Sequence, residues 1–178
     1  MIQTFYSLIA VFVFTMVGLT MHRHVNNTER NAIASEIESV GLDVALFWAN
    51  RVKDYAFDEA DVGVLGMRSD NDVAGLAAPD GLGPEAGEAG PDTFDDIDDF
   101  NGYRMTVSQP IAEGTQDYTV SFAVRYVSPL DFEIDSGSAT TAKSVTVVTR
   151  AIGVNLDIPP IEITLDVPLT PAKLFLHQ

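Results

Sequence analysis

The chain contains no cysteine, and this absence is the first limit on its chemistry. Without thiols there can be no disulfide framework, no thiolate nucleophile and no cysteine-ligated metal. The sequence also has no nucleophile elbow, phosphate-binding loop or dinucleotide fingerprint, because its glycine-rich stretch lacks the lysine and the strand-to-helix context that phosphate binding needs. These absences predict a protein that is not an enzyme and that uses no cofactor.

Basic residues are scarce, since the 178 residues include 10 Lys and Arg against 26 Asp and Glu, a net charge of -16. Nucleic-acid phosphates require a basic face, so this balance argues against a nucleic-acid partner and equally against a peripheral role on anionic lipid. A hydrophobic fraction of 46% nevertheless suits a chain that folds. The length allows one ordinary domain with an appendage.

Charged side chains are missing from the start of the chain, which reads MIQTFYSLIAVFVFTMVGLTM and has its first charge at Arg23. A run of this length can cross a bilayer as a helix that rises about 1.5 Å per residue. A cleaved secretory signal would begin with a basic region and end at a small-residue cleavage site, and neither occurs before Arg23. We therefore expect a membrane anchor rather than a signal peptide.

The charges after this run conflict with the positive-inside rule. Arg23 and Arg30, accompanied by His22 and His24, follow the run and no basic residue precedes it, which would leave the body of the protein in the cytoplasm. Either topology-setting basic residues once lay upstream and were removed, so that Met1 begins a mature chain, or the two arginines only contact lipid headgroups. We favour the first explanation. The histidines are two residues apart and do not face each other on a helix, so they make a poor metal pair.

A second apolar pattern begins after the polar joint HRHVNNTER. Its residues recur in alternating steps of four and three, which indicates an amphipathic helix. The residues expected to pack on the head are Ile33, Ile37, Val40, Val44 and Phe47. No proline occurs before Pro79, so both stretches can form one rod from about Ile2 to Phe57, about 80 Å long. The alternative is two helices separated near Asn26 and Asn27, where Asn-Asn-Thr can cap the second helix.

The remaining sequence predicts a loop followed by a sheet. Residues 58–93 are rich in Gly, Ala, Asp and Pro, as in a long surface loop. Apolar residues alternate in YRMTVSQPI, DYTVSFAVRYVS and AKSVTVVTRAI, as in antiparallel strands, while four prolines confine residues 154–178 to an edge strand or extended arm. The predicted fold class is α+β, with a long N-terminal α-helix (residues 1–57) packed on a small antiparallel β-sheet head (residues 94–178).

Carboxylates are densest in PDTFDDIDDFNGY. Clustered carboxylates can bind calcium, which prefers oxygen ligands, and the candidate ligands are Asp95, Asp96, Asp98 and Asp99. An EF-hand loop does not fit, because placing Gly102 at its sixth position puts Ile97 where the first aspartate belongs and Ser108 where the closing glutamate belongs. The favoured interpretation is a solvated acidic turn without a metal, held by the apolar anchors Phe94, Ile97 and Phe100.

Three stretches resemble segments of one known family. FYSLIAVFVF resembles the F-T-L-I-E-L type of opening, whereas FDDIDDFNGY, followed by YTVSFAVRYVSP and AKSVTVVTRA, resembles the acidic turn and sheet strands of bacterial minor-pilin heads. The whole chain is similar in layout to type IV pilins, minor pilins and the related pseudopilins. It departs from them at Phe5, because the family's usual opening has a glutamate at that mature position.

This resemblance implies a structural subunit of a type IV pilus-like extracellular filament. The chain would be held in the cytoplasmic membrane and then polymerise at the cell surface as a helical homo-oligomer. The implied assembly residues are Phe5, Leu8, Ile9, Phe12, Val13, Met16 and Leu19. Two other functions remain alternatives, a membrane-anchored extracytoplasmic binding module and a viral membrane or coat protein.

Overall fold

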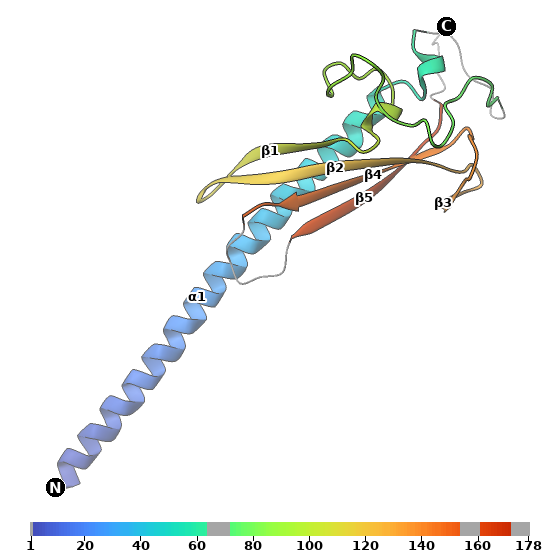
Figure 1. Cartoon of the computed structure of the whole chain (residues 1–178). Helices are drawn as coiled ribbons and strands as arrows, with labels where there is room; N and C mark the ends of the chain where they lie inside the picture. The colour runs from blue at the N-terminus through green and yellow to red at the C-terminus, as the bar shows by residue number, and fades with distance from the viewer. Residues whose placement is uncertain (1, 64–71, 154–160, 172–178) are drawn as a thin grey trace, which may run out of the picture.

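A single long helix dominates the structure. The computed structural model describes residues 2–63, 72–153 and 161–171, and the helix α1 (Ile2–Arg51) is uninterrupted. Its 50 residues form a rod about 75 Å long. Figure 1 shows its N-terminal half projecting from a head that is built by the rest of the chain. The prediction of one rod is confirmed, and the break considered near Asn26 and Asn27 is not found.

The helix ends at Arg51 rather than near Phe57. There the chain tightens into a 3₁₀ turn, η1 (Val52–Asp54), and Tyr55 is extended. Val52 is fully buried and Tyr55 is half-buried, so both continue the apolar stripe although the helical hydrogen bonding has changed. Apolar spacing alone therefore predicted too long a helix.

The head is an antiparallel sheet in the strand order β1-β2-β4-β5. These strands are β1 (Arg104–Ile111), β2 (Gly114–Ser128), β4 (Lys143–Ala151) and β5 (Glu162–Leu169). The short strand β3 (Asp131–Asp135) folds back from the end of β2 and pairs with it outside the main order. One long helix on an antiparallel sheet is the α+β arrangement that the sequence predicted.

Prolines mark both edges of the sheet. Pro110 lies in β1 opposite Thr115, and Pro168 lies in β5 opposite Ser144. Proline has no backbone N–H to donate, so it is tolerated on an edge strand and not in the middle of a sheet. The prediction that the last stretch forms an edge strand is confirmed for β5. The chain between β2 and β4 is more than a simple connection, because it contains β3.

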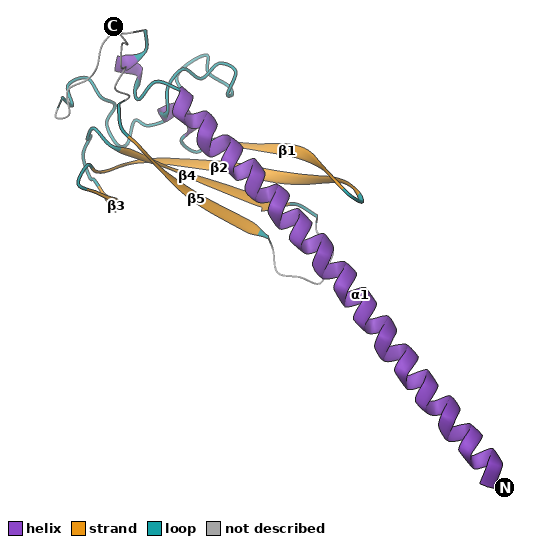
Figure 2. Ribbon diagram, turned by 180° about the vertical axis from the view of Figure 1, so that it is seen from behind, coloured by secondary structure: helices purple, strands orange, loops and turns teal. Residues whose placement is uncertain are grey.

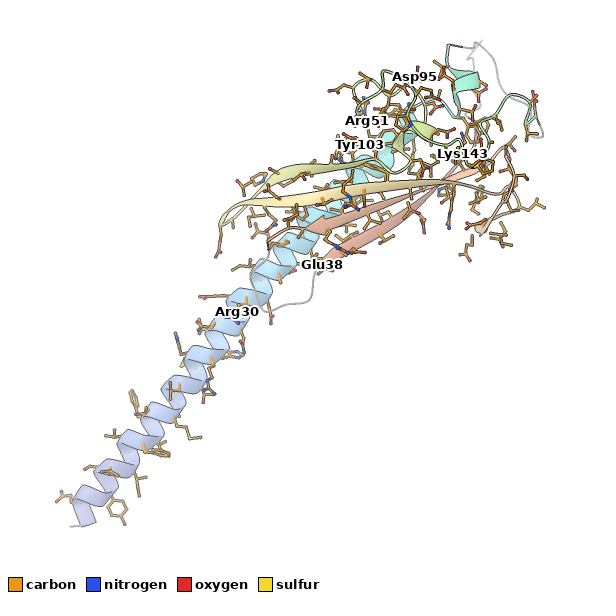
Figure 3. All side chains as sticks on the ribbon, in the orientation of Figure 1. Arg30, Glu38, Arg51, Asp95, Tyr103 and Lys143 are labelled. Atoms are coloured by element: carbon orange, nitrogen blue, oxygen red, sulfur yellow. The ribbon has the colours of Figure 1, made fainter. Side chains whose placement is uncertain are left out.

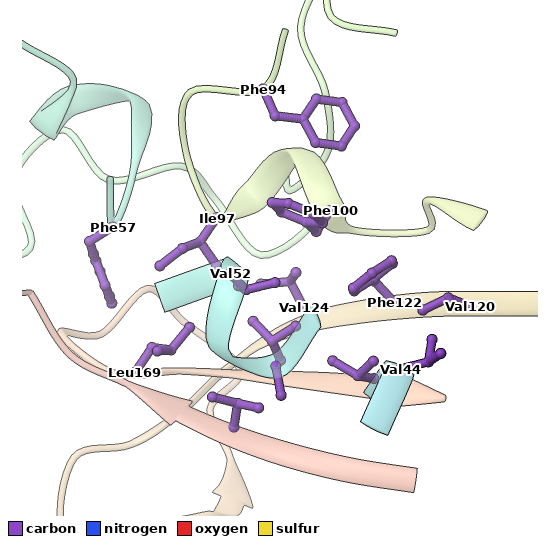
Figure 4. Close-up of a cluster of buried hydrophobic side chains, with 14 residues drawn as sticks. Val44, Val52, Phe57, Phe94, Ile97, Phe100, Val120, Phe122, Val124 and Leu169 are labelled. Carbon is purple, nitrogen blue, oxygen red and sulfur yellow. The ribbon is translucent and has the colours of Figure 1, made fainter. Parts of the chain in front are cut away.

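The core lies where α1 crosses one face of the sheet, as Figure 2 shows. Alternate residues of β2 and β4 point inward and meet the helix, as strand geometry requires. Figure 4 shows the resulting cluster, which also receives the apolar anchors of the acidic segment. Its members include Val44, Val52, Phe94, Ile97, Phe100, Val120, Phe122, Val124, Val145 and Val147. Each such side chain contributes about 1.5–3 kcal/mol by leaving water.

Two contacts bring the helix unusually close to the sheet. A Cβ atom placed on Gly41 would lie 3.1 Å from Ile163 Cδ1 and 3.1 Å from Tyr118 Cε1. One turn earlier, the Tyr118 hydroxyl donates a 2.8 Å hydrogen bond to the backbone carbonyl of Ile37. The helix and the sheet are thus joined by close packing and by a buried hydrogen bond.

Candidate functional site

The N-terminal half of α1 is apolar and lies outside the head. Every side chain described between residues 3 and 32 is exposed, so among the described residues the head does not cover this segment. The predicted assembly residues Leu8, Ile9, Phe12, Val13, Met16 and Leu19 are all among these exposed apolar residues, whereas the Phe5 side chain lies outside the described part. The helix is long and apolar enough to cross a membrane, and its apolar window is not buried as a soluble core helix would be.

Hydroxyl groups along this half are satisfied by the helix itself. Ser7, Thr15 and Thr20 donate to the carbonyls four residues earlier, at 3.0, 2.8 and 2.9 Å. A hydroxyl group bonded in this way does not present an unsatisfied hydrogen-bond donor at the helix surface. Because an unsatisfied polar group costs several kcal/mol in lipid, this arrangement makes the segment compatible with a hydrocarbon environment.

The predicted head-packing residues divide into three groups. Ile37 and Val44 are buried, and Ile33 and Val40 are half-buried. Phe47 does not face the sheet, because 61% of its surface is exposed and its ring stands edge-on to Trp48 at 5.4 Å between centroids. The sheet-facing stripe continues instead through Ala45, Trp48, Ala49 and Val52. Counting only large apolar residues missed the alanines, which allow the close approach.

A second apolar surface lies on the outer side of α1, beside the head. It consists of the exposed side chains Leu42 and Leu46, one helical turn apart, and we call it the outer apolar face; Phe47 is also exposed at this level, but on the flank of the helix beyond Asp43 and Asn50. Gly41 and Ala45, each one position earlier than a leucine of this face, are buried against the sheet. Among the described residues, the sheet covers the inner side of α1 at the level of the head, whereas Leu42 and Leu46 remain exposed on another side.

The acidic segment is buried rather than solvated, which corrects the sequence interpretation. Asp96, Asp98 and Asp99 are buried and Asp95 is exposed, while the anchors Phe94, Ile97 and Phe100 are buried as predicted. Backbone amides explain how the carboxylates are tolerated. Asp96 Oδ1 accepts from the amides of Asp98 and Asp99, and Asp99 Oδ2 accepts from the amides of Asp95 and Asp96. These bonds close the turn around η3 (Asp98–Phe100).

Lys143 anchors this segment to the sheet. Its Nζ lies 2.5 Å from Asp98 Oδ1, 3.0 Å from Asp58 Oδ2 and 2.7 Å from the Phe57 carbonyl oxygen. The rings of Phe57 and Tyr126 flank the ammonium, with centroids at 4.5 and 5.0 Å. Figure 3 places Lys143 at the end of the head that also holds Asp95. No sequence pattern predicted a role for Lys143, which in the sequence is only the first residue of a strand.

Burial and Lys143 act in opposite directions on the two carboxylates. Burial raises the pKa of Asp98 to about 6, and Lys143 offsets only part of this effect. Burial also acts to raise the pKa of Asp58, but the charge and hydrogen bond of Lys143 hold it below the usual range. Asp58 further accepts hydrogen bonds from the amides of Ala60 and Ala77, so it ties residues 58–93 to the head.

The four candidate calcium ligands do not converge on one point. Asp98 pairs with Lys143, and Asp96 is occupied with the amides of the turn. Asp99 instead lies with Glu85 and Glu88, and one oxygen from each of the three carboxylates lies within 4.8 Å of the others. We call these three residues the carboxylate trio. The sequence interpretation missed both glutamates, since they lie more than ten positions before Asp99 in a glycine-rich stretch.

The close approach of the three carboxyl groups shifts the pKa values of the carboxylate trio. Partial loss of contact with water, reinforced by the neighbouring carboxylates, raises the pKa of Glu85 to about 7, although its side chain is still exposed. Burial, together with Glu88 and Asp96, likewise raises the pKa of Asp99 to about 7. Burial also acts to raise the pKa of Glu88, but its hydrogen bond from the Glu85 amide and those with Asp99 and Glu85 hold it below the usual range. Negative charge is therefore unfavourable at two members of the trio, Glu85 and Asp99.

Comparison with known proteins finds no match for this chain. No protein-family model matches the chain, no curated protein matches it, and no solved structure matches it. The chemistry of the site must therefore be argued from the residues of this chain.

Proposed function

We propose that the chain is the structural subunit of a type IV pilus-like extracellular filament, which polymerises through its N-terminal helix. Before assembly the apolar half of α1 holds the subunit in the cytoplasmic membrane, with the head outside. On assembly the same segment leaves the lipid and packs against copies of itself. The exposure of this half around its whole circumference supports both environments, because lipid and neighbouring helices can each cover all sides.

The outer apolar face is the observation that carries the proposal. A monomeric membrane-anchored head needs only the first part of α1 to be apolar. Leu42 and Leu46 lie beyond that part, beside the head, where an isolated subunit would expose them to water. Helices of neighbouring subunits would cover them, and each Å² of apolar surface removed from water contributes about 25 cal/mol.

The continuity of α1 supports the proposed role as a structural subunit. The membrane half and the head half are one helix, so the position of the head follows directly from the packing of the rod. The head is fixed to that helix by the close approach at Gly41 and by the Tyr118 hydrogen bond to Ile37. A filament built on bundled rods would therefore present its heads in a regular array.

The direct test is imaging of material sheared from cells that produce the chain. We expect thin filaments that contain the chain, and mass spectrometry of its first residue would show whether a leader was removed before Met1. The proposal fails if the chain is found only in detergent extracts as a monomer. That outcome would favour the membrane-anchored binding module instead.

A variant pair tests the assembly surface itself. Replacing Leu42→Glu and Leu46→Glu together places two charges on the outer apolar face, and should abolish filaments while the head remains folded, because neither side chain faces the sheet. Asp43→Asn, on an exposed position between them, is the control and should leave filaments intact. Filaments that form normally with both glutamates present would exclude this surface from assembly.

A further inference from the structure

We infer that the carboxylate trio of Glu85, Glu88 and Asp99 is a calcium site. All three side chains offer oxygen, and one oxygen from each lies within 4.8 Å of the others. Calcium takes six to eight oxygen ligands at about 2.3–2.6 Å, and water completes its shell where the protein does not. Three carboxylates at this separation can move onto one ion with small side-chain rotations.

Asp99 provides the independent observation that points to a ligand. Its side chain is fully buried, with a relative exposure of 0%. Oδ2 accepts two backbone amides, at 3.0 and 3.1 Å, whereas Oδ1 is buried without any hydrogen-bond partner. Since Oδ2 is committed to the turn, Oδ1 is the oxygen that remains for the trio. A buried carboxylate oxygen without a donor is destabilising, and a cation would satisfy it.

Charge balance leads to the same conclusion. Among the described residues, no Lys or Arg forms an ion pair with Glu85, Glu88 or Asp99. Lys143 is already surrounded by Asp58, Asp98 and a carbonyl. The crowding extends beyond the trio, because Glu59 lies within interaction range of both Asp95 and Glu88.

The chemistry favours calcium over other common ions. An all-oxygen site without His or Cys is unsuited to zinc and copper. Glu85 is exposed and Glu88 half-buried, so the site is open on one side and retains several waters. Magnesium demands a nearly ideal octahedron, whereas calcium accepts the irregular geometry that three flexible carboxylates provide. An open site of this kind matches the dissociation constants of about 10⁻⁴–10⁻³ M of extracellular calcium modules.

The test is calcium titration of the full chain in detergent micelles at pH 7.5. Isothermal titration should show one site per chain, and the thermal unfolding midpoint should rise in CaCl₂ but much less in MgCl₂ at equal ionic strength. The variant Glu85→Gln with Glu88→Gln should weaken binding at least about tenfold, because two of three ligand charges are gone. These glutamines leave the amide bonds of Asp99 in place, so the head should still fold.

A matched control separates site binding from general charge effects. Glu113→Gln with Glu133→Gln removes two exposed negative charges far from the trio in sequence, and should leave calcium affinity unchanged. The inference is wrong if calcium and magnesium shift unfolding equally, if no binding is detected up to 10-fold above the expected range of about 10⁻³ M, or if the glutamine pair binds as tightly as the native chain. Each of these results is independent of whether filaments form.

Discussion

The Nζ of Lys143 lies 2.5 Å from Oδ1 of Asp98, and both side chains are almost completely shielded from water. These residues are 45 positions apart, and the bond joins the turn η3 to the first residue of β4. Asp58, 85 positions from Lys143, shares the same ammonium. One cation therefore holds together the segment after α1, the acidic segment and the sheet.

Removing this cation should destabilise the head strongly. Lys143→Met keeps the apolar part of the side chain but leaves the carboxylates of Asp58 and Asp98 buried without their counter-ion. Loss of one partner from a buried ion pair costs about 3–5 kcal/mol. Urea unfolding of the full chain in detergent, followed by the fluorescence of Trp48, would measure this change.

Two further variants separate the ion pair from nonspecific effects of the substitution. Lys53→Met removes an exposed lysine whose Nζ donates to Asn50, and should change stability by less than about 0.5 kcal/mol. Adding Asp58→Asn and Asp98→Asn to Lys143→Met should recover part of the loss, since the unpaired charges are then gone. If Lys143→Met alone unfolds like the native chain, the buried ion pair does not stabilise the head.

Gly41 and Gly18 form a natural pair for testing the helix–sheet contact. Gly41→Leu places a side chain where even a Cβ would approach Ile163 and Tyr118 at 3.1 Å, so it should destabilise the head by about 1–3 kcal/mol. A Cβ placed on Gly18 meets nothing within 4 Å, so Gly18→Leu should leave the unfolding of the head unchanged. The same urea titration compares them, and equal effects of the two leucines would contradict the close approach at Gly41.

The hydrogen bond from Tyr118 to Ile37 predicts a smaller effect. Tyr118→Phe keeps the packed ring and removes only the hydroxyl that donates to the helix carbonyl at 2.8 Å. A buried hydrogen bond contributes about 0.5–1.5 kcal/mol, so the midpoint of unfolding should fall modestly with no change in its denaturant slope. A native midpoint in Tyr118→Phe would show that the bond does not contribute.

Head stability without divalent cations should fall as pH rises from about 5 to 8. Burial and Asp98 raise the pKa of Asp96 to about 7, and burial with Glu88 and Asp96 raises the pKa of Asp99 to about 7. In an unfolded chain both groups titrate near pH 4. The folded head thus holds more protons than the unfolded chain across this window, so its stability falls as these protons are released.

The neighbouring groups do not reverse this sign. Asp98 and Glu85 have pKa values raised to about 6 and 7 and add to the same trend, whereas Asp58, with its lowered pKa, stays ionised throughout. Thermal unfolding in EDTA buffers of constant ionic strength would measure the slope. A midpoint that rises with pH across the window would contradict the burial of these carboxylates. Calcium should flatten the slope, because it replaces the protons at the trio.

Local periodicity was enough to predict the framework of this protein. The uncharged run up to Met21 and the stripe through Ile37 and Val44 are spaced for a helix, and alternation marks β1, β2 and β4. These patterns are readable because helices and strands repeat over 3.6 and 2 residues, so each residue's face follows from its near neighbours. Prolines placed β5 at an edge for an equally local reason, the missing N–H.

Long-range packing decided which charged side chains are buried and which partners they have. A run of aspartates has the same sequence whether it faces water or the core, and only the arrival of Lys143 from β4 and the anchoring of Phe100 bury Asp98. The carboxylate trio likewise depends on a loop that brings Glu85 beside Asp99. Phe47 faces outward because Ala45 and Ala49 fit closer to the sheet. The apolar pattern of the chain thus predicts its elements, whereas the partners of its buried charges exist only once those elements have packed.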